Sequence, residues 1–234
     1  MPTNTITDCQ PMIRQRVRIR FTKQDDLRWI SHRDLMRVWE RLFRRAGVVL
    51  SMTEGFHPKP RIHFPSALAV GIAGLDELVE VELAEEHTAD SLQAAIEPEL
   101  PPGMRLGAVD VLTAPDGKAE VKYVTFEMAI PHQRQAGLEK RIGWLLGQKS
   151  IPIAREGRKD PLDLRALIAE LALHSGAANT VGANHGNTDD GVLQMRLRVD
   201  RQGSVRPREV LAALEIEDLE YAGFFLIRTR VEVE

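Results

Sequence analysis

The sequence contains little of several features that mark particular classes of protein. Its single cysteine, Cys9, excludes an internal disulfide and a cysteine-based zinc or iron–sulfur site. No apolar run approaches the roughly 20 residues that a membrane-spanning helix needs. The phosphate-binding patterns G-x-x-x-x-G-K-S/T and G-x-G-x-x-G are both missing. We therefore expect a cytoplasmic protein that has no cofactor, no bound metal and no membrane contact.

The remaining composition is that of an ordinary globular protein. Hydrophobic residues make up 43% of the chain and charged residues 28%, whereas aromatic residues make up only 5%. The length of 234 residues suits one large domain or two small ones, since a typical domain has about 100–200 residues. Residues 1–13 lack the basic and apolar regions of a secretory signal, and we expect them to form a flexible tail.

Charge is distributed unevenly along the chain, although the net charge is only −3. Residues 1–63 carry 13 basic and 6 acidic side chains, whereas residues 64–120 carry 2 basic and 12 acidic ones. Residues 121–234 carry 16 of each sign. Such a basic block indicates either a surface that binds anions or neighbouring strands of opposite charge that neutralise each other.

Residues 14–112 follow the order of a ferredoxin-like domain. Alternating apolar residues predict strands, apolar residues at three- and four-residue spacing predict helices, and clustered prolines predict an edge segment. The predicted elements are a strand at 16–21, a helix at 31–46, an extended segment at 55–64, a strand at 78–83, a helix at 88–97 and a strand at 104–112. The order β-α-β-β-α-β is typical of the ferredoxin-like fold.

A linker at 113–120 leads into a second region, 121–234, that repeats this order less regularly. Its predicted elements are strands at 123–130, 151–155, 193–199 and 224–233, and helices at 135–146, 162–173 and 207–214. Residues 175–191 are rich in Gly, Ala, Asn and Asp, which predicts a mobile loop inside an insertion at about 156–191. The expected fold class is α+β, with two ferredoxin-like units whose antiparallel sheets carry helices on one face.

The predicted helix at 31–46 places a stripe of arginines opposite its apolar face. Ser31 and Asp34 give it a start that resembles a capping box. Because the helix dipole disfavours cations in the first turns, helix stability does not explain the stripe. It is either a solvated face or a surface that contacts phosphates. Its members are Arg33, Arg37, Arg41, Arg44 and Arg45.

The extended segment supplies a second group of candidate binding residues, and a period of two places its basic side chains on one face. The candidates are Phe56, His57, Lys59, Arg61 and His63. On the neighbouring strand, Arg18 and Arg20 point to the open face of the predicted sheet. They are expected to face Glu80 and Glu82, which would leave only the edge formed by the extended segment basic.

Three histidines offer a second, catalytic interpretation. His32, His57 and His63 could act as acid and base in RNA cleavage. Together with Asp34 they could instead bind a metal, but no spacing signature supports either chemistry. Ser31, His32 and Asp34 lie too close together at one helix start to form a nucleophilic triad. Histidines that bond to loop backbone are the simpler interpretation.

Several motifs resemble the radical-SAM-linked protein family, a domain of unknown function that is fused to, or encoded beside, B12-binding-type radical SAM proteins. The similarity covers residues 14–230 and is most specific at 31–36 and 55–60. The motif residues are Ser31, His32, Asp34, Gly55, Phe56, Pro58 and Pro60. The similarity also includes 41–47 and 67–71, and in the second half, where it is looser, Arg206-Pro207 and Arg228-Thr229. By itself, Arg206-Pro207 indicates only the start of a helix.

The resemblance implies a stand-alone protein that acts with a separately encoded radical SAM enzyme, because this chain has no C-x-x-x-C-x-x-C motif of its own. Family members are often encoded near ribonuclease and ribosomal-protein genes, which favours an RNA link. We therefore expect a non-catalytic accessory module whose basic surface binds RNA or another phosphate-rich substrate. The alternatives are a metal-independent endoribonuclease that uses the histidines, and an adaptor that contacts only the radical SAM enzyme.

Overall fold

The first half of the chain forms the strands and helices that its hydrophobic pattern predicts. A computed structural model describes residues 14–113, 117–157, 159–175, 189–200 and 203–234. The first elements are β1 (Gln15–Lys23), η1 (Asp25–Trp29), α1 (His32–Arg45), β2 (Ile62–His63), β3 (Ala73–Leu83), α2 (Ala89–Ile96), η2 (Glu97–Glu99) and β4 (Leu106–Leu112). The predicted strands and helices of this half are confirmed, except that the segment at 55–64 is extended only in part.

The second half contains more strands than the sequence predicts. Its elements are β5 (Val121–Ile130), α3 (His132–Gly147), β6 (Pro152–Ile153), β7 (Leu162–Asp163), α4 (Leu164–Leu167), β8 (Ile168–Ser175), β9 (Gly191–Asp200), β10 (Gly203–Ser204), α5 (Pro207–Ala213), α6 (Asp218–Tyr221) and β11 (Ile227–Val233). No described helix combines the length and apolarity needed to cross a membrane.

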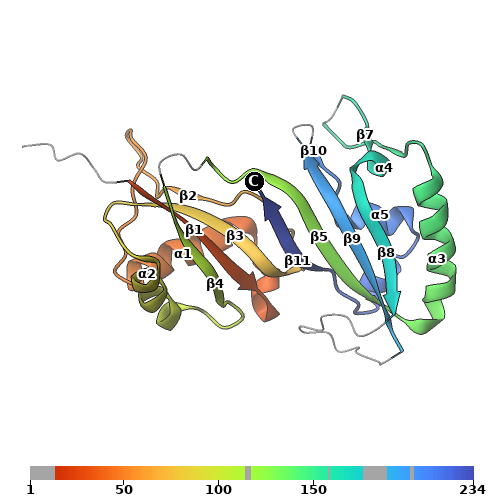
Figure 1. Ribbon diagram of the computed structural model, residues 1–234, viewed down its shortest axis with the longest axis horizontal. Coiled ribbons are helices and arrows are strands. Elements are labelled where there is room, and N and C mark those ends of the chain that lie inside the picture. The colour runs from red at the N-terminus through yellow and green to blue at the C-terminus, as the bar shows by residue number, and fades with distance from the viewer. Residues whose placement is uncertain (1–13, 114–116, 158, 176–188, 201–202) are drawn as a thin grey trace, which may run out of the picture.

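Most of these strands join one large sheet (Figure 1). Its order is β10-β9-β5-β11-β3-β1-β4, with β8 paired to β9 and β2 paired to β3, while β6 and β7 form a separate pair. The pairs are antiparallel except for a short parallel contact between β3 and β11, where Arg228 lies opposite Gly74. The fold is therefore α+β, with a mainly antiparallel sheet.

The helices of both halves pack on the same face of this sheet. In the first half, the Phe21 ring on β1 contacts the buried Trp39 ring of α1 at 5.0 Å between centroids. In the second half, Phe126 on β5 belongs to the core that includes Leu138 of α3 and Val210 of α5. The opposite face carries mainly polar side chains, because the period of a strand sends alternate residues outward.

The predicted helix at 162–173 is wrong, and the predicted insertion at 156–191 is wrong where it includes residues 168–175. Only one helical turn forms at α4, after which β8 pairs antiparallel with β9 over most of its length. Leu171 is buried in the core of the second half. The short apolar run fits a helix or a strand, and pairing with β9 decides for the strand. Residues 168–175 of the predicted insertion are thus a strand of the main sheet.

Three predicted segments lie wholly or partly outside the described residues. The tail at 1–13 lies outside them, as do residues 176–188 of the predicted loop at 175–191 and residues 114–116 of the linker.

The predicted extended segment at 55–64 is only partly extended. Bends at 54–57 interrupt its start, and its pairing with β3 is restricted to Ile62–His63. Its prolines withhold backbone donors from a longer ladder.

Two glycines give stability predictions of opposite sign. Gly103 has φ +82°, and a Cβ there would lie 2.6 Å from the backbone oxygen of Gln24. Gly143 lies inside α3, where an added Cβ meets nothing within 4 Å. We expect Gly103→Ala to destabilise the protein by more than about 1 kcal/mol. We expect Gly143→Ala to stabilise it by about 0.5–1 kcal/mol.

Urea denaturation followed by circular dichroism measures both changes. Equal midpoints for the two variants would contradict the backbone conformation described at Gly103 and the helical position of Gly143.

Candidate functional site

The five arginines predicted for the helix stripe all lie on the exposed side of α1. Arg37 pairs with Asp34 at 3.2 Å, and Arg45 pairs with Glu99 at 2.8 Å. Within the described part of the chain, three members have no ion-pair partner: Arg33, Arg41 and Arg44. The outer face of α1 therefore carries positive charge that no ion pair among the described residues compensates.

Ser31 fixes the start of this helix, as the sequence predicts. Its Oγ accepts a hydrogen bond from the Asp34 backbone N–H at 3.2 Å and donates one to Asp34 Oδ2 at 2.7 Å. The hydrogen bond from Ser31 is the main cause of a lowered pKa of Asp34, and Arg37 adds to it. Asp34 is thus held ionised where the helix dipole favours a negative charge.

The acidic strand β3 does not neutralise the arginines of α1. Val79 and Val81 pack in the core beneath α1, so Glu80 between them points to the opposite face of the sheet. Glu80 is only 5% exposed and accepts hydrogen bonds from Arg18 at 2.8 Å and from the Ala119 backbone N–H at 3.1 Å. Its negative charge is therefore neutralised by arginine on the open face of the sheet.

The predicted pairing between β1 and β3 is confirmed for Arg18 and wrong for Arg20. The antiparallel register places Glu82 at the other end of β1 from Arg20. The Arg20 guanidinium therefore pairs with Asp76 at 2.6 Å. Glu82 pairs instead with Arg61, at 3.4 Å. The open face over these strands is consequently lined by matched charges.

The segment at 55–63 does not form the single basic face that period two predicts. The exposed tip contains Gly55, Phe56, His57, Pro58 and Lys59. Pro60 forms a bridge with Met52, which folds the tip back on itself. Beyond this fold, Arg61 contacts Glu82, and His63 lies opposite Glu80 on the open face. The structure therefore separates the tip from the two basic residues that follow it.

The three histidines proposed as acid and base do not meet. The His32 ring packs edge-on against the Phe64 ring at 5.2 Å, on the side of the sheet that α1 covers. His63 points to the opposite side, and His57 is exposed at the tip of the loop. No group of three His, Cys, Asp or Glu residues within the described ranges is arranged to hold a metal ion.

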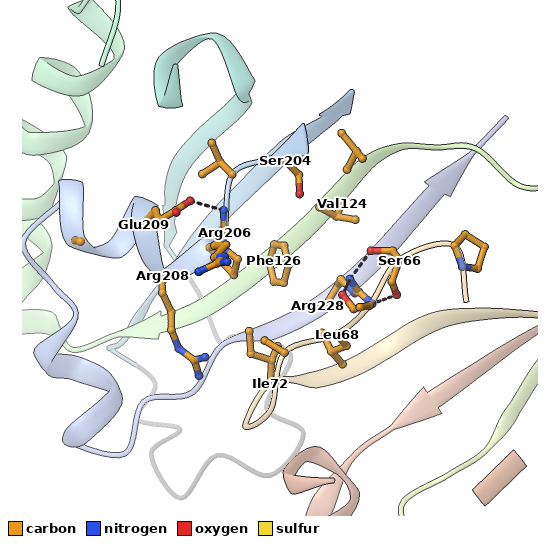
Figure 2. Close-up of a pocket in the computed structure, with 17 residues that line it drawn as sticks. Ser66, Leu68, Ile72, Val124, Phe126, Ser204, Arg206, Arg208, Glu209 and Arg228 are labelled. Carbon is orange, nitrogen blue, oxygen red and sulfur yellow. Dashed lines mark hydrogen bonds between the residues drawn. The ribbon is translucent and has the colours of Figure 1, made fainter. Parts of the chain in front are cut away.

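A pocket of about 770 Å³ lies over strands β5 and β11, between the segment at 65–72 and α5 (Figure 2). Residues 65–69 form one wall, and the start of α5 forms the other. Arg206, Pro207, Arg208 and Glu209 belong to the second wall, so the predicted helix start at Arg206-Pro207 is confirmed and lies at a cavity. This pocket also brings together two other parts of the chain that resemble the radical-SAM-linked family, namely residues 67–69 and Arg228.

Buried charges lie beneath this pocket. Arg228 of β11 and Glu77 of β3 form an ion pair in which both side chains are almost fully buried. Arg228 also donates hydrogen bonds to Ser66 Oγ at 2.9 Å and to the Ala67 carbonyl at 3.2 Å. Lys23 is buried nearby and donates to the Ile30 carbonyl at 3.0 Å. Burial lowers the pKa of Lys23, and Glu77 opposes this shift.

Sequence reasoning missed this buried network, although the pattern contained a signal. Lys23 continues the inward series of Val17, Ile19 and Phe21 on β1. Glu77 likewise continues an inward series on β3. A charged residue in the apolar phase of a strand must find a partner, because an isolated buried charge is very costly.

Comparisons with known proteins assign no activity to either site. A family model described as "Uncharacterized protein conserved in bacteria (DUF2344)" matches residues 16–207. No curated protein matches. The solved structures with some similarity include "Crystal Structure of an Unknown Protein from Galdieria sulphuraria", at 14% identity over 94% of this chain and 99% of that chain, with a TM-score of 0.27.

Another is "Crystal structure of putative glycine cleavage system transcriptional repressor", at 12% identity over 92% of this chain and 99% of that chain, with a TM-score of 0.24. Similarity at these scores carries no conclusion about fold or function.

Breaking the buried ion pair should destabilise the protein strongly. We expect Arg228→Met to lower the free energy of unfolding by about 3–5 kcal/mol, because it leaves the Glu77 carboxylate buried and unpaired. The control is Arg196→Met, which breaks partly exposed pairs with Glu232 and Glu170 on the open face. There we expect a loss of about 1 kcal/mol or less.

Adding Glu77→Gln to Arg228→Met should recover part of the lost stability in urea denaturation, since the two side chains interact directly. Strictly additive losses would show that the two side chains do not depend on each other.

The protonation of His63 gives a pH-dependent prediction. Burial lowers the pKa of His63, and the nearby Glu80 charge works against this shift. The unfolded chain therefore binds a proton at a higher pH than the folded protein, so the contribution of His63 to stability falls as pH drops below the ordinary histidine pKa. We expect an NMR titration to give a midpoint below about 6.5.

Glu80→Gln should lower this midpoint further, because it removes the charge that favours the protonated ring. A midpoint that rises in Glu80→Gln would place His63 in a different electrostatic environment.

Proposed function

The chain belongs to the family of uncharacterized proteins conserved in bacteria (DUF2344), and from this premise we propose that it is a non-catalytic binding module. Its basic surface contacts RNA or another phosphate-rich substrate, and it acts with a separately encoded radical SAM enzyme in the cytoplasm. The observation that carries this proposal is the outer face of α1. Its five arginines are exposed, and three of them have no ion-pair partner in the described part of the chain: Arg33, Arg41 and Arg44.

The position of the acidic side chains supports a role for these arginines in binding. Glu80 and Glu82 lie on the other face of the sheet, where they form ion pairs with Arg18 and Arg61. Arg33 and Arg41 lie on the exposed side of a helix whose opposite face is packed on the sheet, so they are available to a large ligand. Phosphates exchange their counterions for such side chains, which makes binding sensitive to salt.

The exposed tip at 55–59 can extend this surface. The Phe56 ring is fully exposed, and His57 and Lys59 flank it. An exposed ring beside cations suits stacking on an unpaired base, which is the usual way in which proteins recognise single-stranded RNA. Arg61 and His63 are weaker candidates, since they contact the acidic side chains of β3.

We further propose that residues 14–112 and 121–234 are two ferredoxin-like units. The first half has the strand order β4-β1-β3-β2, and the second half has the order β11-β5-β9-β8. With the two-residue strands β6, β7 and β10 left out and the others numbered within each half, both orders read 4-1-3-2. Each half carries two helices in the crossover positions, namely α1 and α2 or α3 and α5. This arrangement supports two copies of the β-α-β-β-α-β order.

The radical SAM partner is proposed from the resemblance of the motifs at 31–36 and 55–60. Ser31 and Asp34 hold the start of α1, so this motif positions the first arginines of the basic surface. A chain that cannot hold an iron–sulfur cluster itself would supply substrate binding, and the partner would supply the radical chemistry. A pure adaptor would use the same exposed arginines to contact acidic side chains of that partner.

The endoribonuclease alternative has less support. General acid–base catalysis needs both groups within hydrogen-bond reach of the reacting atoms. His32 and His63 lie on opposite sides of the sheet, so they cannot act on the same phosphate. His57 could act only alone, from the tip of an exposed loop.

RNA binding across a salt series tests the proposal. We expect the purified chain to bind total cellular RNA without shortening it, and the affinity to fall steeply as salt rises. The triple variant Arg33→Gln, Arg41→Gln, Arg44→Gln should bind more weakly. Its slope of log affinity against log salt should be smaller by about 2, since each lost contact with a single strand removes about 0.7.

The matched control removes three exposed arginines outside α1: Arg105→Gln, Arg198→Gln, Arg230→Gln. It should bind RNA like the unchanged protein, which separates a localised surface from a general effect of net charge. Affinity that does not depend on salt, or equal losses in both triple variants, would overturn the RNA proposal. Shortened RNA would favour the endoribonuclease, and absent RNA binding would favour the adaptor.

A further inference from the structure

The pocket over β5 and β11 is separate from the exposed surface of α1 and has the character of a small-molecule site. We propose that it binds a small organic monoanion with an apolar body, such as an aromatic or medium-chain carboxylate. A volume of about 770 Å³ falls within the range of about 300–1,000 Å³ that is typical of ligand sites. The proposal does not depend on RNA binding.

The floor of the pocket is apolar and already buried. Phe126 and Val124 of β5 lie at its centre in Figure 2, with Leu68 and Ile72 on one side. Val205 also lines the pocket. All five belong to the core of the second half and are held by neighbouring strands and helices. An apolar ligand body would cover this floor without rearranging it, and binding would be favoured mainly by removal of the ligand's own apolar surface from water.

The charged residues around the floor favour a single negative charge on the ligand. Three guanidiniums line the pocket, and two of them are matched by carboxylates: Arg208 by Glu220 and Arg228 by Glu77. The one carboxylate of the lining, Glu209, is matched by Arg155 from outside the lining. The third guanidinium, Arg206, is exposed at the wall and has no ion-pair partner among the described residues. One guanidinium of the lining is therefore left for an anionic ligand.

The polar walls are held in place before any ligand arrives. The Glu209 carboxylate accepts hydrogen bonds from Arg155 at 2.6 Å and from the Arg206 backbone N–H at 2.7 Å, which fixes the start of α5. On the other wall, Ser66 is held by Arg228 through both its Oγ and its carbonyl. A site held in this way loses little conformational entropy when a ligand binds.

A pair of fluorescent probes tests both parts of the proposal. 8-Anilinonaphthalene-1-sulfonate has two aromatic systems and one negative charge, and N-phenyl-1-naphthylamine is the same framework without the charge. We expect the sulfonate probe to bind at one saturable site. Arg206→Gln should lower the affinity for the sulfonate probe by about 10-fold, in line with loss of one charge-assisted contact. It should leave the affinity for the neutral probe unchanged.

A second variant blocks the pocket without removing a charge. Ala212 is exposed on α5 and lines the pocket, so Ala212→Trp should fill it and weaken both probes by at least about 10-fold. The matched control is Ala94→Trp, at an exposed position of α2 away from the pocket. It should bind both probes like the unchanged protein, and circular dichroism should show that both variants are folded.

Three results would overturn the proposal. The first is probe binding that Ala212→Trp leaves unchanged although it is folded. The second is equal weakening of both probes by Arg206→Gln, which would mean that the charge is not recognised. The third is the absence of saturation for the unchanged protein. None of these results bears on RNA binding, so failure of this site and failure of the proposed function can be told apart.

Discussion

The buried ion pair between Glu77 and Arg228 is the interaction on which the arrangement of the two halves depends. The strands that carry these residues, β3 and β11, share only a short parallel contact, which by itself fixes little. The ion pair adds two charges that are almost completely buried, and neither can lose the other without a large cost in free energy. The Glu77 side chain crosses the backbone at Gly74, where a Cβ would lie 2.5 Å from its carboxylate oxygen. The glycine therefore makes this route possible.

Local pattern was sufficient to predict most of the first half and less of the second. The strand of Val17, Ile19 and Phe21 and the amphipathic helix after Ser31 form as predicted, because alternation and capping are local signals. The prediction of a helix at 162–173 failed because the apolar residues there fit either a helix or a strand, and only pairing with β9 decides between them. The buried network around Glu77 was missed for a similar reason. Its partners Lys23 and Arg228 are about 50 and 150 residues distant in sequence, and only the fold brings them together.

The candidate surfaces were predicted in part for the same reason. The exposed arginines of α1 follow from helical periodicity, which depends only on neighbours in sequence. The common face of His57 and His63 required an unbroken strand, and the bridge between Pro60 and Met52 interrupts it. The pocket at Arg206 was beyond reach, because its two walls come from different halves of the chain. The position of Glu80 on the face opposite α1 was predictable, because the period of two places it beside Arg18 on the open face.

The two proposed sites lie close enough for contacts to connect them. Lys23 donates to the carbonyl of Ile30, directly before the start of α1, and interacts with the charge of Glu77 beneath the pocket. His32 at the start of α1 packs on Phe64, which precedes the pocket wall at 65–69. Contact alone does not couple two sites, however, because coupling needs an element with two arrangements whose balance each ligand shifts. Lys23 and Arg228 are buried, Lys23 donates to two carbonyls and Arg228 makes five hydrogen bonds, which favours one arrangement. Binding at the pocket and binding at α1 should therefore be independent, and each site can be tested alone.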